Sequence, residues 1–483
     1  MSFASPLFLW GFMPAVLATY FIFPARLRNS ILALASLLFY AYGAHNLVIL
    51  LVAGIATNFV AGIAIEDAKT SKGRNLYLGL TIVFDLSILS YWKYAGFLTH
   101  QIHSLVNQFG GHGFPIIEVT LPVGISFFTF HLLSYVIDIW RGRSVALRQP
   151  LSFVTYIAMF PQLIAGPIVR YHEIDDQLHE IRKHRFTDLS AGFPRFILGL
   201  SKKVVVADTV APVASSLFFH HSGHLTTGSA WIGVIAFTIQ IYFDFSGYSD
   251  MAIGLARMFG FRFPENFERP YSALSITDFW RRWHMSLSRW FRDYLYIPLG
   301  GNQGSPIQTY RNLIVVFILT GLWHGAAWTF LLWGLYHGGL LIWERRLPKY
   351  RLRDVTSESS QLGLWKVVWF RARAFLLVTI GWVLFRAPGL GQALHIFHSM
   401  FWPSGFGLTQ DMSLVLSHQR QLILWFACLV VVLPRGFSMG KFLDEGRGRF
   451  AEGFRLAFVL AMIPITTILV AAGTFSPFLY YQF

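Results

Sequence analysis

One histidine lies well inside an apolar stretch of the sequence. His324 belongs to RNLIVVFILTGLWHGAAWTFLLWGLYHG (residues 311–338) and lies thirteen residues beyond Arg311, about 20 Å along a helix at 1.5 Å per residue. Ionisable side chains at such depth in a membrane are costly, commonly face a cavity and mark a functional path. A buried histidine without an acidic partner stays neutral and can accept a proton, so His324 is a candidate general base. The alternative is a histidine that only makes a hydrogen bond between helices.

A second segment, TDFWRRWHMSLSRWFRDYLYIPLGGN (residues 277–302), combines aromatic and basic side chains. At helical spacing one side of it is formed by Trp280, Trp283, His284, Leu287 and Phe291. We expect this helix to lie at the cytoplasmic interface, with His284 facing the protein interior. The arginines of the segment are Arg281, Arg282, Arg289 and Arg292. They either anchor the helix at the membrane surface or flank an entrance for an anionic donor, because guanidinium groups bind phosphate well.

Three further polar residues lie in apolar surroundings. His337, one helix beyond His324, is either its partner or an interhelical hydrogen-bonding residue. Asp244 and Asp250 belong to FDFSGYSDMAIGLARMFGF (residues 243–261). We interpret these two carboxylates as capping and interhelical hydrogen-bonding groups.

No metal site and no tightly bound cofactor is expected. The grouped histidines, which are His220, His221 and His224, have no acidic or thiolate residue beside them. The single cysteine, Cys428, lies in an apolar run, so neither a disulfide framework nor a thiolate cluster is expected. The sequence also has no G-x-S-x-G elbow, P-loop or dinucleotide fingerprint, which argues against soluble-type hydrolase, ATPase or dehydrogenase chemistry.

The elements that must position these residues belong to a membrane protein. Of the 483 residues, 54% are hydrophobic and 13% are charged, whereas soluble domains carry about 25% charged residues. Apolar runs long enough to cross a bilayer recur from residue 6 to residue 474, which predicts one intramembrane domain over 1–483. We divide it into N-terminal helices (1–145), a catalytic core (146–345) and C-terminal helices (346–483). The net charge of +15 fits cytoplasmic loops and anionic lipid, and nucleic acid is not expected as a partner.

Basic residues mark every second loop of the N-terminal part. They occur at 26–28, 66–74 and 141–143, whereas the loops at 41–46 and 99–114 contain no lysine or arginine. By the positive-inside rule, the basic loops are cytoplasmic and the N-terminus is outside, which in a bacterium is the periplasm. The apolar runs predict an all-α polytopic protein with about 11–12 transmembrane helices.

One apolar piece, Leu151–Val169, interrupts this alternation because basic residues flank both of its ends. Pro161 and the Gly166-Pro167 pair also break it. We therefore expect a re-entrant hairpin, which is tolerated at membrane depth only where protein or a cavity covers its backbone.

Seven stretches together resemble the membrane-bound O-acyltransferase (MBOAT) superfamily, and within it the membrane subunits of bacterial alginate O-acetyltransferases. They are SYWKYAGF (90–97), LPVGISFFTFHLLSYVIDIWRG (121–142), FPQLIAGPIVR (160–170), FDFSGYSDMAIGLARMFGF (243–261), DFWRRWHMSLSRWFRDYLYIPLGG (278–301), LTGLWHGAAWTFLLWGLYHG (319–338) and GWVLFRA (381–387). The resemblance covers nearly the whole chain. Together the stretches are highly specific, although any one alone would not be.

The resemblance implies a core with re-entrant and interfacial helices and a tunnel between the two membrane faces. It implies that His324 matches the catalytic histidine of the family and His284 its second functional histidine. It further implies acetyl-CoA as the cytoplasmic donor and an extracytoplasmic acetyltransferase partner that modifies a polysaccharide such as alginate, at the cell inner membrane. The alternatives are a D-alanyl or peptidoglycan acyl-transfer subunit, a transporter of an anionic solute, and a structural export subunit.

Overall fold

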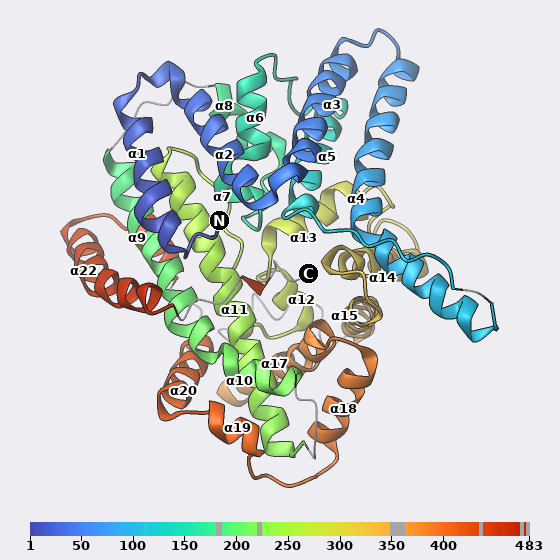
Figure 1. Ribbon diagram of the computed structural model, residues 1–483, viewed down its shortest axis with the longest axis vertical. Helices are drawn as coiled ribbons and strands as arrows, with labels where there is room; N and C mark the ends of the chain where they lie inside the picture. The colour runs from blue at the N-terminus through green and yellow to red at the C-terminus, as the bar shows by residue number, and fades with distance from the viewer. Residues whose placement is uncertain are drawn as a thin grey trace. The chain divides into compact units, whose positions relative to one another are not determined.

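The computed structural model describes residues 1–111, 113–179, 186–219, 225–347, 363–433, 438–473 and 478–479. Every regular element in these ranges is a helix, which confirms the predicted all-α class (Figure 1). The chain forms two compact units. Unit 1 comprises Met1–Phe193 and Ala252–Pro264, and unit 2 comprises Pro194–Met251 and Glu265–Phe483. The helices α9 (Phe186–Ser201) and α11 (Thr227–Met258) each contribute residues to both units.

Unit 1 begins with a succession of apolar helices. They are α1 (Met13–Ile22), α2 (Arg28–Ala44), α3 (Val48–Asp67), α4 (Ser71–Gln108) and α5 (Ile125–Trp140). The helices α3, α4 and α5 pack against one another. Gly62 makes the contact between α3 and α5 close, because a Cβ at this position would overlap the ring of Tyr135.

The piece that the sequence predicts as a hairpin is broken where its proline and glycines stand. It forms α6 (Pro150–Ala158), the short α7 (Phe160–Leu163) and a turn, and α8 (Tyr171–His179) follows. Because α6 packs against α8, the chain reverses direction here, and Figure 1 shows α7 at the far end of this reversal. The freed backbone groups find buried partners: the Phe160 N–H donates to the Ser36 hydroxyl at 3.1 Å, and the Tyr156 hydroxyl donates to the Val169 carbonyl at 3.2 Å. The backbone is therefore covered as expected, and the membrane side from which it enters stays a prediction.

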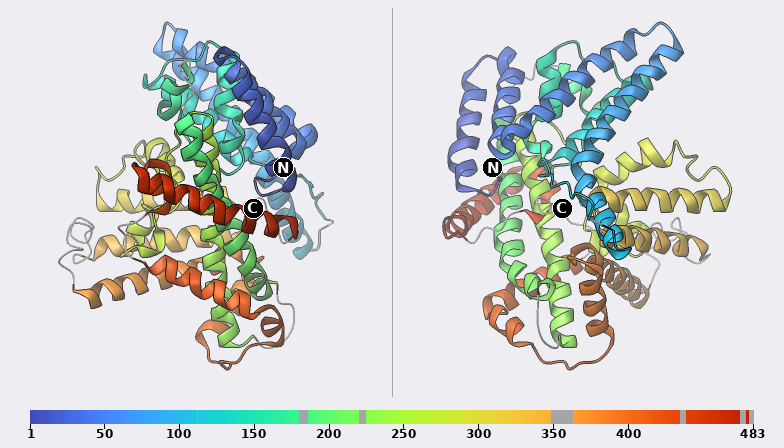
Figure 2. Two further views of the ribbon diagram at one scale, coloured as in Figure 1. Left: turned by 90° about the vertical axis from the view of Figure 1, so that its left-hand side faces the viewer. Right: turned by 45° about the vertical axis from the view of Figure 1, so that its right-hand side comes forward.

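Unit 2 contains the helices that carry the candidate site. They are α10 (Asp208–Phe218), α12 (Ile276–Trp280), α13 (Met285–Phe291), α14 (Pro306–His324), α15 (Trp328–Arg346), α17 (Leu364–Arg386), α18 (Leu390–Phe401), α19 (Gln410–Val415), α20 (His418–Val432), α21 (Met439–Glu445) and α22 (Arg449–Ala471). The helices α14 and α15 form a tight hairpin, seen in yellow and ochre in Figure 2. Gly321 and Gly334 permit it, because a Cβ on either would overlap a backbone carbonyl of the other helix.

Five helical stretches among the described residues are long and apolar enough to cross a membrane. They are Ala25–Asp67, Ser71–Gln108, Thr227–Met258, Leu364–Arg386 and Arg449–Ala471. Three shorter apolar helices accompany them, at Leu7–Ile22, Ile125–Trp140 and His418–Val432. These helices agree with a multi-pass membrane protein, and the total of 11–12 spans stays a prediction.

Candidate functional site

His324 is the last residue of α14 and lies at the tip of the α14–α15 hairpin. The start of α14 is fixed by a capping box: the Gln308 N–H donates to the Ser305 hydroxyl at 3.3 Å, and the Ser305 N–H donates to the Gln308 side chain at 3.0 Å. The helix ends at Gly325, whose backbone is extended. The His324 side chain is buried, with 5% of the residue exposed. The sequence prediction of a buried histidine at this place is confirmed, and its catalytic role stays a prediction.

Aromatic rings surround the His324 imidazole. Its ring centroid lies 4.8 Å from that of Trp323, 5.0 Å from that of Phe385 on α17 and 5.2 Å from that of Trp333 on α15. Rings of this kind exclude water and disfavour a charged side chain. The hairpin thus holds the His324 imidazole among aromatic rings.

The predicted single helix over 277–302 is wrong. The chain forms α12, then a turn, then α13, and continues through a π-helical turn at Arg292–Tyr296. His284 occupies the break, with φ of +44° in the left-handed region. Such a conformation is uncommon for a residue with a side chain, so surrounding contacts must hold it in place.

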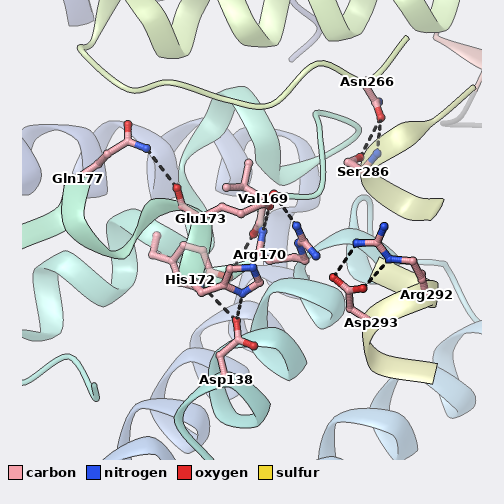
Figure 3. A network of polar contacts seen from close by, with 11 residues as sticks. Asp138, Val169, Arg170, His172, Glu173, Gln177, Asn266, Ser286, Arg292 and Asp293 are labelled. Atoms are coloured by element: carbon pink, nitrogen blue, oxygen red, sulfur yellow. Dashed lines mark hydrogen bonds and ion pairs between the residues drawn. The ribbon is translucent and has the colours of Figure 1, made fainter. Parts of the chain in front are cut away.

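Asn266 supplies those contacts from eighteen or more residues upstream. Its side-chain oxygen accepts hydrogen bonds from the Ser286 N–H at 3.2 Å and the Ser286 hydroxyl at 2.9 Å (Figure 3). Its backbone carbonyl accepts from the Met285 N–H at 2.9 Å. These bonds satisfy N–H groups in the first turn of α13 from outside the helix. Sequence reasoning missed Asn266, because its partners are distant in the sequence.

His284 is held by the same asparagine. The residue is 1% exposed, and its Nδ1 lies 3.1 Å from the Asn266 side-chain oxygen. Because that oxygen is an acceptor, the hydrogen-bond network assigns the ring proton to Nδ1, which leaves Nε2 as an acceptor. His284 lies outside the candidate spans, and burial lowers its pKa to about 3, so the imidazole is neutral. His284 does face the interior, as the sequence predicts.

Trp323 connects the two candidate histidines. Its ring centroid lies 6.0 Å from that of His284 and 4.8 Å from that of His324. The structure therefore brings the two histidines to the same indole, although they are forty positions apart in the sequence. The arrangement can offer two imidazoles to one substrate group.

The four arginines are not equivalent. Arg282 donates from Nε to Asp278 at 2.7 Å. Arg292 donates from Nε and Nη2 to Asp293 at 2.7 and 3.2 Å (Figure 3). The other two, Arg281 and Arg289, are exposed and half-buried respectively. A role of all four in donor binding stays a prediction.

Asp244 and Asp250 belong to buried ion pairs. Asp250 accepts from Arg195 at 2.8 Å and from Lys202 at 2.6 Å. Asp244 lies 2.7 Å from Lys203. These contacts join α11 to α9 and the turn after it, which confirms the interhelical interpretation of both carboxylates. The basic partners were not identified from the sequence.

Unit 1 contains a further polar pair that sequence reasoning missed. Asp138 on α5 is buried, and one of its carboxylate oxygens lies 2.8 Å from His172 Nδ1 and accepts the His172 N–H at 3.2 Å (Figure 3). Next to it, Arg170 pairs with Glu173 at 2.7 Å. These contacts fix the start of α8 after the hairpin.

The described residues contain no group of three or more His, Cys, Asp or Glu side chains able to hold a metal ion. The histidines at 220, 221 and 224 lie outside the described residues. His337 is fully buried on α15, and within the described part of the chain neither of its ring nitrogens has a hydrogen-bond partner. The interhelical hydrogen bond expected for it is therefore not found.

Comparison with known proteins places these residues in a family. The profile of the MBOAT, membrane-bound O-acyltransferase family matches residues 88–353, which include His284 and His324. The chain is 40% identical to the probable alginate O-acetylase AlgI of Azotobacter vinelandii, over 100% of both chains. It is 44% identical to the protein of that name from Pseudomonas aeruginosa, over 92% of this chain and 83% of the relative. It is 35% identical to the peptidoglycan O-acetyltransferase of Helicobacter pylori, over 84% and 81%. The chain is thus a multi-pass membrane O-acyltransferase that belongs to the membrane-bound O-acyltransferase family.

Proposed function

We propose that this protein takes an acetyl group from cytoplasmic acetyl-CoA and passes it through the membrane for O-acetylation of an extracytoplasmic polysaccharide such as alginate. The observation that carries the proposal is the placement of two buried histidines, His324 and His284, against one indole, next to a segment rich in arginine. The names of the relatives support polysaccharide as the acceptor class. An extracytoplasmic acetyltransferase acts as the partner that completes the transfer.

In the proposed reaction, His324 is the general base. It accepts the proton of an acceptor hydroxyl as the oxygen attacks the thioester carbonyl. The new C–O bond forms, the C–S bond breaks, and the thiolate of coenzyme A leaves and takes up a proton. Alternatively His324 is the nucleophile: its nitrogen forms a C–N bond to the acetyl carbon as the C–S bond of the donor breaks, and coenzyme A leaves as the thiol. The acceptor hydroxyl then attacks the acetyl-imidazole, so that the C–O bond forms, the C–N bond breaks and the hydroxyl proton returns to the histidine. His284, whose Nε2 can accept a hydrogen bond, orients the acceptor or a water beside the reacting atoms.

The proposal includes an orientation in the bacterial inner membrane, with the N-terminus in the periplasm and the arginine segment facing the cytoplasm. The alternation of basic loops supports it. Reporter fusions at the N-terminus and after Arg143 test it, because the first should report a periplasmic and the second a cytoplasmic position. The opposite result at both sites would invert the proposed route of the donor.

Labelled acetyl-CoA separates the function classes. Purified protein is incubated with the donor, with and without an extracytoplasmic acetyltransferase partner and its polymer. We expect free coenzyme A and acetylated polymer only in the complete mixture. A transporter would move an anionic solute without an acyl product, and a structural export subunit would work equally well as His324→Ala.

The acceptor has a second candidate, because one relative is a peptidoglycan O-acetyltransferase. Offering alginate and peptidoglycan fragments in parallel decides between the two polymers. The acyl donor also has an alternative, which is a D-alanyl group on a carrier protein. Replacing acetyl-CoA by a D-alanyl carrier protein tests it, and we expect no transfer from that donor.

A further inference from the structure

Three neighbouring aromatic residues of unit 2 bury polar nitrogens without protein partners. They are His337 on α15, Trp333 one turn before it, and Trp280 at the end of α12. Within the described residues, Nδ1 and Nε2 of His337 and Nε1 of both tryptophans have no hydrogen-bond partner. His337 is 0% exposed and Trp333 is 1% exposed. Trp280 is half-buried, but its Nε1 atom is buried, so bulk water does not satisfy these nitrogens.

The three rings pack directly against one another. The His337 ring centroid lies 5.0 Å from that of Trp280 and 5.1 Å from that of Trp333, and the two indoles are 5.6 Å apart. The His337 and Trp280 rings meet edge to face, at 89°. The helix α17 approaches the imidazole closely at Gly381. A Cβ at this position would come within 2.6 Å of His337 Nε2, so only glycine leaves room for the ring.

Buried polar groups in proteins are almost always hydrogen-bonded, to protein or to ordered water. A neutral imidazole offers one donor and one acceptor, and each indole offers one donor. The cluster therefore has three N–H groups and a single lone pair. Such a set fits an oxygen that accepts hydrogen bonds. A phosphate would bring uncompensated charge into an aromatic shell, which is costly.

We propose that His337, Trp280 and Trp333 form a binding site for one neutral oxygen acceptor, either an ordered water or the carbonyl oxygen of the acyl donor. Trp333 also packs against His324, with ring centroids 5.2 Å apart, so the site adjoins the candidate base. Trp280 belongs to the arginine segment, so the site also adjoins the proposed donor entrance. Binding of an ordered water does not depend on the proposed acetyl transfer, whereas binding of the donor carbonyl oxygen rests on it.

The test replaces each indole N–H without changing the size of the ring. The full-length protein is prepared with the isosteric tryptophan analogue that carries sulfur in place of N–H, at 280 or at 333. The same substitution at Trp231, whose Nε1 donates to the Met400 carbonyl at 3.0 Å, calibrates the loss of one known hydrogen bond. Trp365, which is 85% exposed, is the neutral control. The melting temperature is measured with and without acetyl-CoA, in the wild-type protein and in His324→Ala.

If the oxygen is a water, the substitution at 280 or 333 lowers the melting temperature without donor by about 1–3 °C, similar to the change at 231. If the oxygen belongs to the donor, the melting temperature without donor is unchanged, and the stabilisation by acetyl-CoA is smaller than in the wild type. The proposal is overturned if both substitutions leave the melting temperature unchanged or raised, with and without donor, because removal of a truly unpaired N–H relieves a desolvation cost. The measurement in His324→Ala involves no turnover, so failure of acetyl transfer leaves this result readable.

Discussion

The α14–α15 hairpin and the segment around α12 and α13 place their histidines in different ways. In the hairpin, sequence-local features hold His324: a capping box, two regular helices and the glycines that let them pack closely. Around α12 and α13, a distant residue holds His284: Asn266 supplies the bonds that break the helix there. A local pattern therefore predicts the first histidine correctly and misplaces the backbone of the second. The comparison implies that the two histidines should respond differently to changes in helix packing and in the Asn266 contacts.

The largest effect is expected from adding a side chain at a glycine where the two helices of the hairpin are in close contact. In Gly334→Ala the new Cβ would overlap the Phe317 carbonyl, so the helices must separate and carry His324 with them. We expect a loss of about 1–3 kcal/mol in stability and acyl transfer near the detection limit. The matched control is Gly339→Ala on the same helix, where no atom lies within 4 Å of the added Cβ. This control substitution should leave the free energy of unfolding unchanged or raise it by up to about 1 kcal/mol. Equal effects of the two substitutions would contradict the role of close packing.

A smaller effect is expected from the asparagine that holds the second region. Asn266→Ala leaves the Ser286 N–H and hydroxyl and the His284 N–H unpaired, which should cost about 1–3 kcal/mol and lower the transfer rate by about tenfold. Asn58→Ala is the control, because Asn58 is equally buried and donates to Asp85 and Gly54. It should lower the melting temperature without changing the rate per folded molecule. A rate loss of the same size in both variants would show that Asn266 has no special relation to the chemistry.

The smallest effect concerns the arginines and compares Arg281 with Arg282 and Arg292. Arg281→Ala should raise the KM for acetyl-CoA by about 3- to 10-fold at low salt, because a charge-assisted hydrogen bond to phosphate is lost. Arg282→Ala and Arg292→Ala should each raise it less, since these side chains already bind Asp278 and Asp293. Steady-state kinetics at two ionic strengths measures both, and the difference should shrink at high salt. An unchanged KM in the quadruple variant would leave all four as lipid anchors.

The sequence predicts the fold well where the deciding interactions join residues that are close in the sequence. Composition and apolar run length identify a multi-pass helical membrane protein, and Pro161 with Gly166 marks a chain break that the structure contains. The buried position of His324 agrees with its place well inside an apolar stretch of the sequence. In these cases the deciding interaction lies within one helix turn or one apolar stretch.

Prediction from the sequence fails where a partner comes from far along the chain. Helical spacing around His284 takes no account of Asn266, whose backbone and side chain bind the first turn of α13. Arg282 is a different case, because its partner Asp278 lies four residues earlier, at a helical spacing from which the pair could have been predicted. His337 looks like an ordinary hydrogen-bonding residue, yet its neighbours are rings. Pairing of polar groups across elements is a tertiary property that spacing alone does not encode.

The proposed reaction assigns the acyl transfer to His324 at the hairpin tip. The most direct measurement is the single-turnover transfer of label from acetyl-CoA by purified wild-type protein, His324→Ala and His284→Ala, with partner and polymer present. We expect the His324→Ala protein to be folded, with a melting temperature near that of the wild type, and its transfer rate to be lower by about 10²–10⁴-fold. His284→Ala should lose less, because its proposed role is to orient the acceptor. A His324→Ala protein that transfers label at a rate within a few fold of the wild type would contradict the proposed role of His324.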